Sequence, residues 1–436
     1  MSQRIRPQLV PPLLFWSMQA IFAGALGLSF AAAWASPVEH TRMFPNKTET
    51  VVPVPRKQPL RIMPLYNDPK LVSDEDLGAV LAKVRPRFDQ TKLRPNFVEH
   101  ALRIWSVDAE FGDPKVMSGQ QMKEFLIDHG KYLASWGSEI KPLLLDQPGG
   151  VAIRWGLEEC ASVHHDHWLA CLTEAGVSLD QPVFTPARHM HTINDVIQQS
   201  LRDFRLDERE TEWSTMAFGL WIAPTKAWTN GEGRQISFDQ IAERLIRGHK
   251  RLGVCNGLHR VYSLVVLIRL DNDHKILSAG VREKIFDHLR GVRRNIMESQ
   301  FEDGHWPTNW MDGAEAISKP VDDPLFRKVI ATGHHLEWMA IAPPELHVPR
   351  EQLEKAAKWV IATTKAQTTE GIQQHYTFYS HVGGALSLWR NTRAADFWKD
   401  WERKHPEVNI PEPKSEQAQA TDGKATPAAK ADAAAH

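Results

Sequence analysis

Two kinds of helical segment alternate along the middle and C-terminal parts of this 436-residue chain. The first kind is amphipathic: between Val281 and Ile296, apolar residues recur at helical spacing among charged ones. The second kind, such as 258–270 (LHRVYSLVVLIRL), is apolar on nearly every side after its first turn, so other helices must surround it. Segments 353–361, 335–342 and 381–389 continue the alternation, and no convincing strand pattern interrupts it.

This alternation predicts an all-α fold. A single helical hairpin cannot bury its own apolar face, so neighbouring hairpins must stack. The body holds roughly twelve expected helices, which suits an α/α toroid: a closed barrel of about six helical hairpins with an inner and an outer ring. An open solenoid is the alternative, although helices that are apolar all round favour closure. The helices expected before residue 237 are 96–107, 119–132, 155–175, 192–204 and 212–223.

The first 35 residues predict export. Arg4 and Arg6 precede an uncharged, mostly apolar run from Leu13 to Ala35, which ends in an A-x-A-like cleavage site. The run is also long enough to span a bilayer, so residues 1–35 are interpreted as either a signal peptide or a membrane anchor. In both cases the remainder is expected in a periplasmic or other extracytoplasmic compartment.

Three regions are expected after this segment. Residues 36–69 are rich in proline and predict an extended linker. Residues 70–405 are the expected α/α-toroid domain. Residues 406–436 are rich in alanine, lysine and proline and lack the apolar content needed to fold, which predicts a disordered tail.

The charge balance and the common catalytic motifs exclude several function classes. Lys and Arg number 52 against 53 Asp and Glu, so nothing indicates a nucleic-acid partner. Contact with a membrane is expected only through the N-terminal segment. Nucleophile-elbow, Walker, dinucleotide-binding, H-E-x-x-H and haem-attachment patterns are absent from the sequence. Three cysteines are too few for a disulfide framework.

A turn follows the amphipathic helix that ends near Ser299. Here Gln300, Gly304 and Trp306 are spaced Q-x3-G-x-W. This pattern resembles the QW motif of the terpenoid cyclase and protein prenyltransferase α/α-toroid superfamily. The resemblance implies that Gln300 lies at the end of an outer helix and that Trp306 packs against the adjacent repeat, as a brace between helices. The D-x-D-D and D-x-C patterns of that superfamily's enzymes are absent, so the resemblance implies the fold and not the reaction.

Histidines recur near the expected starts of three apolar helices. His259 follows Cys255-Asn256-Gly257, His334 and His335 precede Glu337, and His381 begins the third apolar segment. In a closed ring, equivalent helix starts meet at one end of the central cavity. His and Glu side chains can act there as acid, base or ligand. The predicted catalytic residues are therefore His259, His334, His335, Glu337 and His381.

A second candidate site lies in ECASVHHDHWLAC, residues 159–171. If this segment is helical, its Cys and His residues fall on one narrow stripe, and pairs four residues apart can share a metal ion. The stripe is too long for all of them to bind one ion. The predicted ligands of a divalent metal cofactor are Cys160, His164, His167 and Cys171.

Three functions remain open on the sequence. The chain is interpreted first as a ligand-binding or scaffolding protein of the cell envelope, which needs no catalytic motif. The 16 tryptophans and acids such as Glu212 and Glu337 also suit a carbohydrate-active hydrolase or lyase. The Q-x3-G-x-W resemblance suggests an isoprenoid-handling cyclase or transferase. In each case the expected partner is a small molecule, carbohydrate or lipid in a central cavity, and the sequence leaves open whether the chain is an enzyme.

Overall fold

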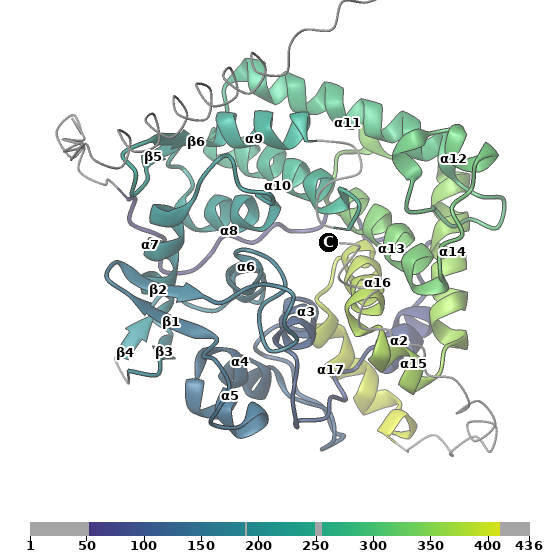
Figure 1. Cartoon of the computed structure of the whole chain (residues 1–436). Helices are drawn as coiled ribbons and strands as arrows, with labels where there is room; N and C mark the ends of the chain where they lie inside the picture. The colour runs from purple at the N-terminus through teal and green to yellow at the C-terminus, as the bar shows by residue number, and fades with distance from the viewer. Residues whose placement is uncertain (1–51, 188–189, 249–254, 410–436) are drawn as a thin grey trace, which may run out of the picture. The chain divides into compact units, whose positions relative to one another are not determined.

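Helices dominate the structure, a computed structural model that describes residues 52–187, 190–248 and 255–409 (Figure 1). Strands within these ranges form three short antiparallel hairpins. The hairpins are β1–β2 (Leu144–Gln147 and Gly150–Ile153), β3–β4 (Pro182–Phe184 and Met190–Thr192) and β5–β6 (Ala227–Thr229 and Gln235–Ser237). The predicted all-α class is therefore confirmed as a predominantly helical fold, with hairpins that the sequence did not predict.

Six helices form the buried centre. They are α3 (Pro95–Trp105), α6 (His167–Glu174), α8 (Glu212–Ile222), α10 (Leu258–His274), α13 (Leu325–Ile341) and α16 (Tyr376–Trp389). Each contacts the next in this order, and α16 contacts α3 again. Most of their residues are buried. The segments predicted to be apolar all round, at 258–270, 335–342 and 381–389, lie in or almost wholly within α10, α13 and α16.

Amphipathic helices pack on these six. They are α2 (Asp74–Lys83), α4 (Gly119–Ile127), α7 (Ile193–Asp203), α9 (Phe238–Arg247), α11 (Ala279–Ser299), α14 (Arg350–Ala366) and α17 (Ala394–Lys404). The predicted stripe from Val281 to Ile296 is the buried face of α11. Ser237 and Gln240 form the capping box that begins α9. Shorter helices are α5 (His129–Trp136), α12 (Glu315–Ser318), α15 (Thr369–Gln374) and the 3-10 turns η1 (Trp310–Asp312), η2 (Pro344–Leu346) and η3 (Pro406–Asn409).

The helix predicted over 155–175 is mostly wrong, because helix α6 begins only at His167. The preceding Asp166 has a left-handed backbone with φ 55°. Its carboxylate accepts hydrogen bonds from Ser200 and Ser214, both at 2.5 Å. These long-range hydrogen bonds hold residues 160–166 in turns, whereas the sequence pattern alone suits a helix.

Residues 56–68, named the strap here, run extended along the C-terminal ends of the central helices. The strap's backbone N–H groups donate to carbonyls at the ends of α8, α13 and α16: Arg56 to Trp221, Leu60 to Leu220, Leu65 to Ala340 and Asp68 to Trp389, over 2.8–3.2 Å. The described part of the expected linker is therefore extended, but it is attached to the body.

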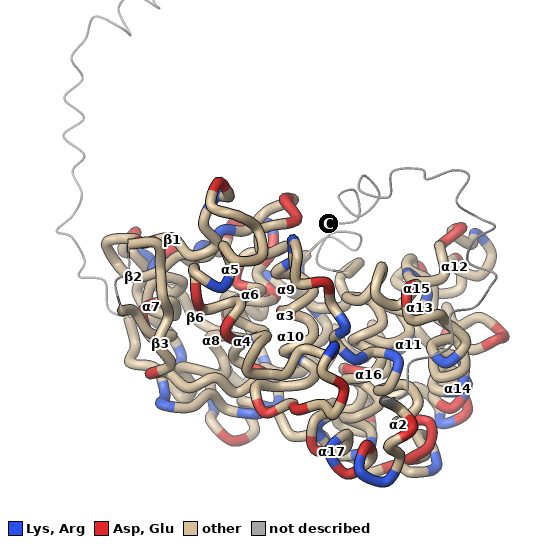
Figure 2. Tube along the Cα trace, turned by 90° about the horizontal axis from the view of Figure 1, so that it is seen from below, with Lys and Arg blue, Asp and Glu red and all other residues tan. Residues whose placement is uncertain are grey.

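Charged residues of both signs are interspersed along the described segments, in keeping with the formal net charge of −1 (Figure 2). Within these segments, none of the helices has the length and apolar character needed to cross a membrane. The segment predicted to direct export, 1–35, lies outside the described residues, as does 410–436 of the expected tail. The start of that tail, 406–409, forms η3.

The turn at 300–306 connects α11 to neighbouring elements through side-chain hydrogen bonds. Gln300 Nε2 donates to the carbonyls of Gly304 (2.9 Å) and Gln352 (2.8 Å). Gly304 has φ +107°, and a Cβ there would lie 2.5 Å from the Lys355 carbonyl oxygen. Trp306 is fully buried, and its indole N–H donates to Ile296 O over 2.8 Å.

Substitution of Trp306 by alanine should destabilise the fold by about 3–5 kcal/mol, because it leaves a large cavity and an unpaired Ile296 carbonyl. Chemical denaturation of the full chain measures this loss. Trp155→Ala is the matched control, since Trp155 is 51% exposed and should cost far less. Equal losses in the two variants would contradict a bracing role for Trp306.

Candidate metal centre

One aromatic side chain from each central helix meets in a single layer at the centre of the six helices. Five of the six are histidines. Successive ring centroids lie 4.6 Å (His100–His167), 4.3 Å (His167–Trp213), 4.2 Å (Trp213–His259), 4.5 Å (His259–His334), 4.0 Å (His334–His381) and 5.2 Å (His381–His100) apart. These residues are named the six-ring layer here.

Burial keeps four imidazoles of this layer neutral, those of His100, His259, His334 and His381. It lowers the pKa of His100 and His259 well below the usual range, and neighbouring His167 and His334 add to the effect. Burial and His334 together lower the pKa of His381 to about 3. Burial also lowers the pKa of His334, although its hydrogen bond to Glu337 opposes the shift. Neutral imidazole is the form that binds metal ions, because one ring nitrogen keeps its lone pair.

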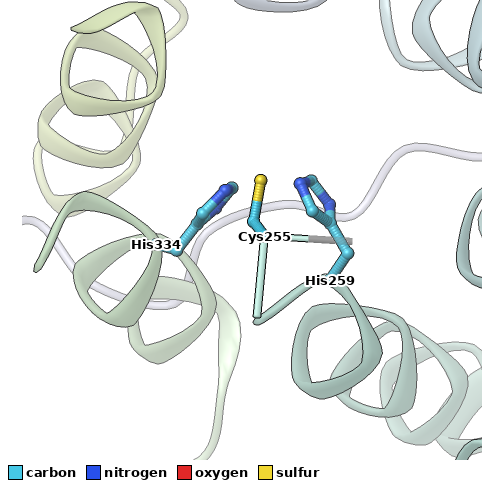
Figure 3. A group of neighbouring side chains, drawn as sticks. All are labelled: Cys255, His259 and His334. Atoms are coloured by element: carbon cyan, nitrogen blue, oxygen red, sulfur yellow. The ribbon is translucent and has the colours of Figure 1, made fainter. Parts of the chain in front are cut away.

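Cys255, His259 and His334 converge on one point (Figure 3). One potential ligand atom from each lies within 4.8 Å of the other two. Neither ring nitrogen of His259, nor Nε2 of His334, has a hydrogen-bond partner among the described residues. His381 Nε2 also lacks one, and its ring lies 5.6 Å from that of His259. Sulfur and imidazole nitrogen are the ligands that Zn²⁺ prefers.

An unusual backbone conformation precedes α10 and carries the Cys255 thiol. Cys255, Asn256 and Gly257 have φ values of 49°, 55° and 79°. Left-handed backbone costs energy in residues other than glycine, and such strain concentrates at functional sites. Burial and the nearby Glu337 carboxylate raise the pKa of Cys255 to about 12, so the thiol is neutral without a cation beside it. A bound metal ion would favour its thiolate form.

Glu337 belongs to a second group of candidate ligands, with His334 and His381, whose ligand atoms also lie within 4.8 Å of one another. Its Oε2 accepts from His334 Nδ1 (2.8 Å) and lies 3.2 Å from His381 Nδ1. Its Oε1 pairs with Arg103 Nη1 over 2.9 Å. Burial alone would raise the pKa of Glu337, but Arg103 and the histidine contacts hold it well below its usual range. Since Arg103 already supplies the positive charge here, Glu337 suits an orienting role: it fixes His334 so that Nε2 points to the cluster.

The sequence candidates separate in the structure. His259, His334, Glu337 and His381 lie together, but His334 and Glu337 stand in the middle of α13 and not at its start, because α13 begins at Leu325. His335 points to another interface, where Trp306, Trp310 and Trp338 surround its ring. A shared site that includes His335 is therefore contradicted, because adjacent residues on a helix point about 100° apart.

The sequence reasoning missed His100, Arg103 and Trp213. His100 and Arg103 stand one turn apart on the buried helix α3, and Trp213 stands in the first turn of α8. The signal available in the sequence was the position of a polar residue within an otherwise apolar helix. His259 was selected in this way, and the same criterion could have been applied to the other buried helices.

The second candidate group does not form a stripe. Cys160 Sγ accepts from Arg154 Nη2 at 3.4 Å, while His164 Nδ1 bonds Glu210 at 2.6 Å. His167 bonds Glu99 inside the layer. Cys171 is fully buried on α6, and burial raises the pKa of its thiol well above the usual range. The helical premise for a metal site on Cys160, His164, His167 and Cys171 fails, because only His167 and Cys171 lie on α6.

Comparison with known proteins adds no constraint: no family model, curated protein or solved structure matches the chain. The site is therefore interpreted from its own geometry.

Glu99 allows a test of the buried network. It is fully buried, accepts from Ser162 at 3.2 Å and bonds His167. Burial raises its pKa to about 8, against the opposing Ser162 hydrogen bond. The folded state therefore holds a proton between about pH 4.5 and 8 that the unfolded state releases, and stability must fall as pH rises through this window.

Glu99→Gln removes this proton, so the free energy of unfolding of the wild type should fall relative to the variant from pH 5 to 8. The slope should be at most about 1.4 kcal/mol per pH unit. Urea titrations at a series of pH values measure the difference. Glu159→Gln, on an exposed side chain, is the control and should show no such slope. Parallel wild-type and Glu99→Gln profiles would show that Glu99 is ionised in the fold.

Proposed function

We propose that this chain is an exported α/α-toroid protein that binds a transition-metal ion, Zn²⁺ by its ligand chemistry, together with a small-molecule ligand at its centre. The toroid is supported by the contact order of the six central helices, which returns from α16 to α3. The amphipathic helices that pack on them correspond to an outer ring. The turn at Gln300, Gly304 and Trp306 fits the brace that the superfamily resemblance implies.

The metal ion is supported by one observation above all. The side chains of Cys255, His259 and His334 bring sulfur and nitrogen within 4.8 Å of one another, and His259 has no other polar partner among the described residues. Three protein ligands leave a fourth position for water or substrate, as in catalytic zinc sites. His381 lies next to this group, with its ring centroid 4.0 Å from that of His334 and 5.6 Å from that of His259.

The contacts of the acidic side chains distinguish between the three functions that the sequence leaves open. An isoprenoid cyclase would need a cluster of aspartates at the centre. Asp271 instead pairs with Arg282 (3.0 Å), and Asp323 accepts from Thr308 Oγ1 (2.7 Å). A glycosidase would need a protonated carboxyl opposite a carboxylate, whereas Glu337 is ionised against Arg103. Ligand binding with a metal ion therefore fits the described residues best.

Purified full-length protein should contain about one equivalent of zinc, measured by elemental analysis. Cobalt exchanged into the site should give a thiolate-to-cobalt charge-transfer band. Cys255→Ser should remove that band, and His334→Ala should lower metal content at least about tenfold. Cys160→Ser and His335→Gln are the matched controls. Each replaces a residue of the same type that is not a proposed ligand, so both variants should retain the metal. Metal-free wild-type protein that binds neither zinc nor cobalt would contradict the proposal.

Export is the second part of the proposal and has its own test. The full chain and a chain lacking residues 1–35 are expressed in a bacterium, and the cells are fractionated. The full chain should leave the cytoplasm, because its basic start and uncharged run direct translocation, whereas the truncated chain should stay. Equal cytoplasmic retention of the two would contradict it.

A further inference from the structure

A cavity of about 420 Å³ is lined in part by the Arg103–Glu337 pair. Its lining comes from α3, α6, α8, α10, α13 and α16, from the connection to α17 and the start of that helix, and from strap residues Leu60 to Pro64. This volume falls in the range of small-molecule sites. The metal candidates Cys255, His259 and His334 do not line it.

The inner end of the cavity is a buried polar array. Arg103 lies between two carboxylates: its Nε bonds Glu174, and its Nη1 pairs with Glu337 at 2.9 Å. Tyr262 donates to Glu174 Oε1 at 2.9 Å, and the Arg103 guanidinium lies over the Tyr262 ring at 5.1 Å. The side chain of Arg103 is 4% exposed, and its contacts with Glu174, Glu337 and His381 are made through Nε and Nη1. A guanidinium donor therefore stands beside two carboxylate acceptors in the lining of the cavity.

The side walls of the cavity differ in character. The strap contributes apolar side chains, among them Leu60, Ile62 and Pro64. The helices contribute neutral hydrogen-bonding groups near the ends of α3 and α16, among them Ser106, Asn391 and Thr392, together with apolar side chains such as Ile104 and Leu388. A ligand that fills this space needs an apolar face toward the strap and a polar edge toward the helices.

The charges lining the cavity cancel. Arg61, Arg103 and Arg393 face Glu174, Glu337 and Asp396, three of each sign. Arg393 and Asp396 also pair with each other near the mouth. An anion would meet two carboxylates at the inner end, and a cation would meet the Arg103 guanidinium. A hydroxyl group satisfies both, because it accepts from Arg103 and donates to a carboxylate.

We propose that this cavity binds a neutral sugar ring, with hydroxyl groups in the Arg103–Glu174–Glu337 array and its C–H face against Leu60 and Ile62. The proposal rests on the ligand-binding part of the proposed function and is independent of the metal ion. Glu337 contributes to both the cavity and the metal candidates, because its Oε1 pairs with Arg103 while its Oε2 accepts from His334. The sugar therefore lies one side chain away from the metal candidates.

The test uses the full-length protein, with and without metal, and four probes. Glucose and cellobiose are the neutral ligands, while glucosamine and glucuronate carry a positive and a negative charge on the same ring. Calorimetry and saturation-transfer NMR measure binding. At least one neutral sugar should bind at millimolar concentration or better, and each charged analogue should bind at least about tenfold more weakly than glucose. Failure of both neutral sugars to bind, or equal binding of a charged analogue, overturns the proposal.

Two variants locate the site. Glu174→Gln removes a carboxylate acceptor and should weaken sugar binding about tenfold. Thr392→Trp blocks the cavity from a half-buried lining position and should abolish it. Glu351→Gln, on an exposed side chain, is the control and should bind as the wild type does. Melting temperatures verify that each variant is folded.

Zinc content is measured on the same samples, so the two proposals can fail separately. Sugar binding in a chain that takes up no metal would refute only the metal centre. Zinc uptake without sugar binding would refute only the sugar site. Sugar binding that survives both Glu174→Gln and Thr392→Trp in folded protein would place the sugar elsewhere and overturn the assignment of this cavity.

Discussion

The buried pair between Arg103 on α3 and Glu337 on α13 is the interaction on which the centre depends. Both side chains are almost fully buried, so removing Arg103 would leave the Glu337 carboxylate without its cationic partner, at a cost of about 3–5 kcal/mol. The pair also influences the protonation of the neighbouring histidines. An ionised Glu337 accepts from His334, and the positive charge of Arg103 disfavours further protonation of the layer. Burial, to which Arg103 adds and which Glu337 opposes, keeps His334 and His381 neutral, so each has a ring nitrogen available as a ligand.

The helices that were predicted correctly from the sequence are those whose pattern of buried residues is uniform along their whole length. The buried helix α10 and the amphipathic helices α11 and α14 have apolar patterns that local periodicity is enough to interpret. Residues 155–166 were mispredicted because Asp166 is held by Ser200 and Ser214, which lie 34 and 48 residues further on. The short hairpins were missed for a related reason: strands of three or four residues carry too few side chains to show alternation.

The candidate site was predicted in part because a histidine inside an apolar helix is conspicuous. That signal selected His259, His334 and His381, and it equally selected His335, whose ring packs among tryptophans. To tell which of His334 and His335 faces the layer, one must know how α13 is oriented about its own axis. The helices packed on both sides of α13 determine this orientation. Arg103 could not be singled out at all. An arginine near the end of an amphipathic segment normally faces water, and only the packing of α3 against α6 and α16 turns this one inward.

Packing alone does not account for the six-ring layer. Apolar side chains of similar size would fill the same space without desolvating imidazoles. Within the described layer, His259 contributes two unpartnered ring nitrogens, and Trp213, His334 and His381 contribute one each. Leaving a buried polar group unsatisfied costs about 1–3 kcal/mol, so such groups normally have a partner. Natural sequences accept such penalties mainly where function requires them. A metal ion at Cys255, His259 and His334 would remove part of this cost, because it would bind one lone pair each of His259 and His334 that no described residue satisfies.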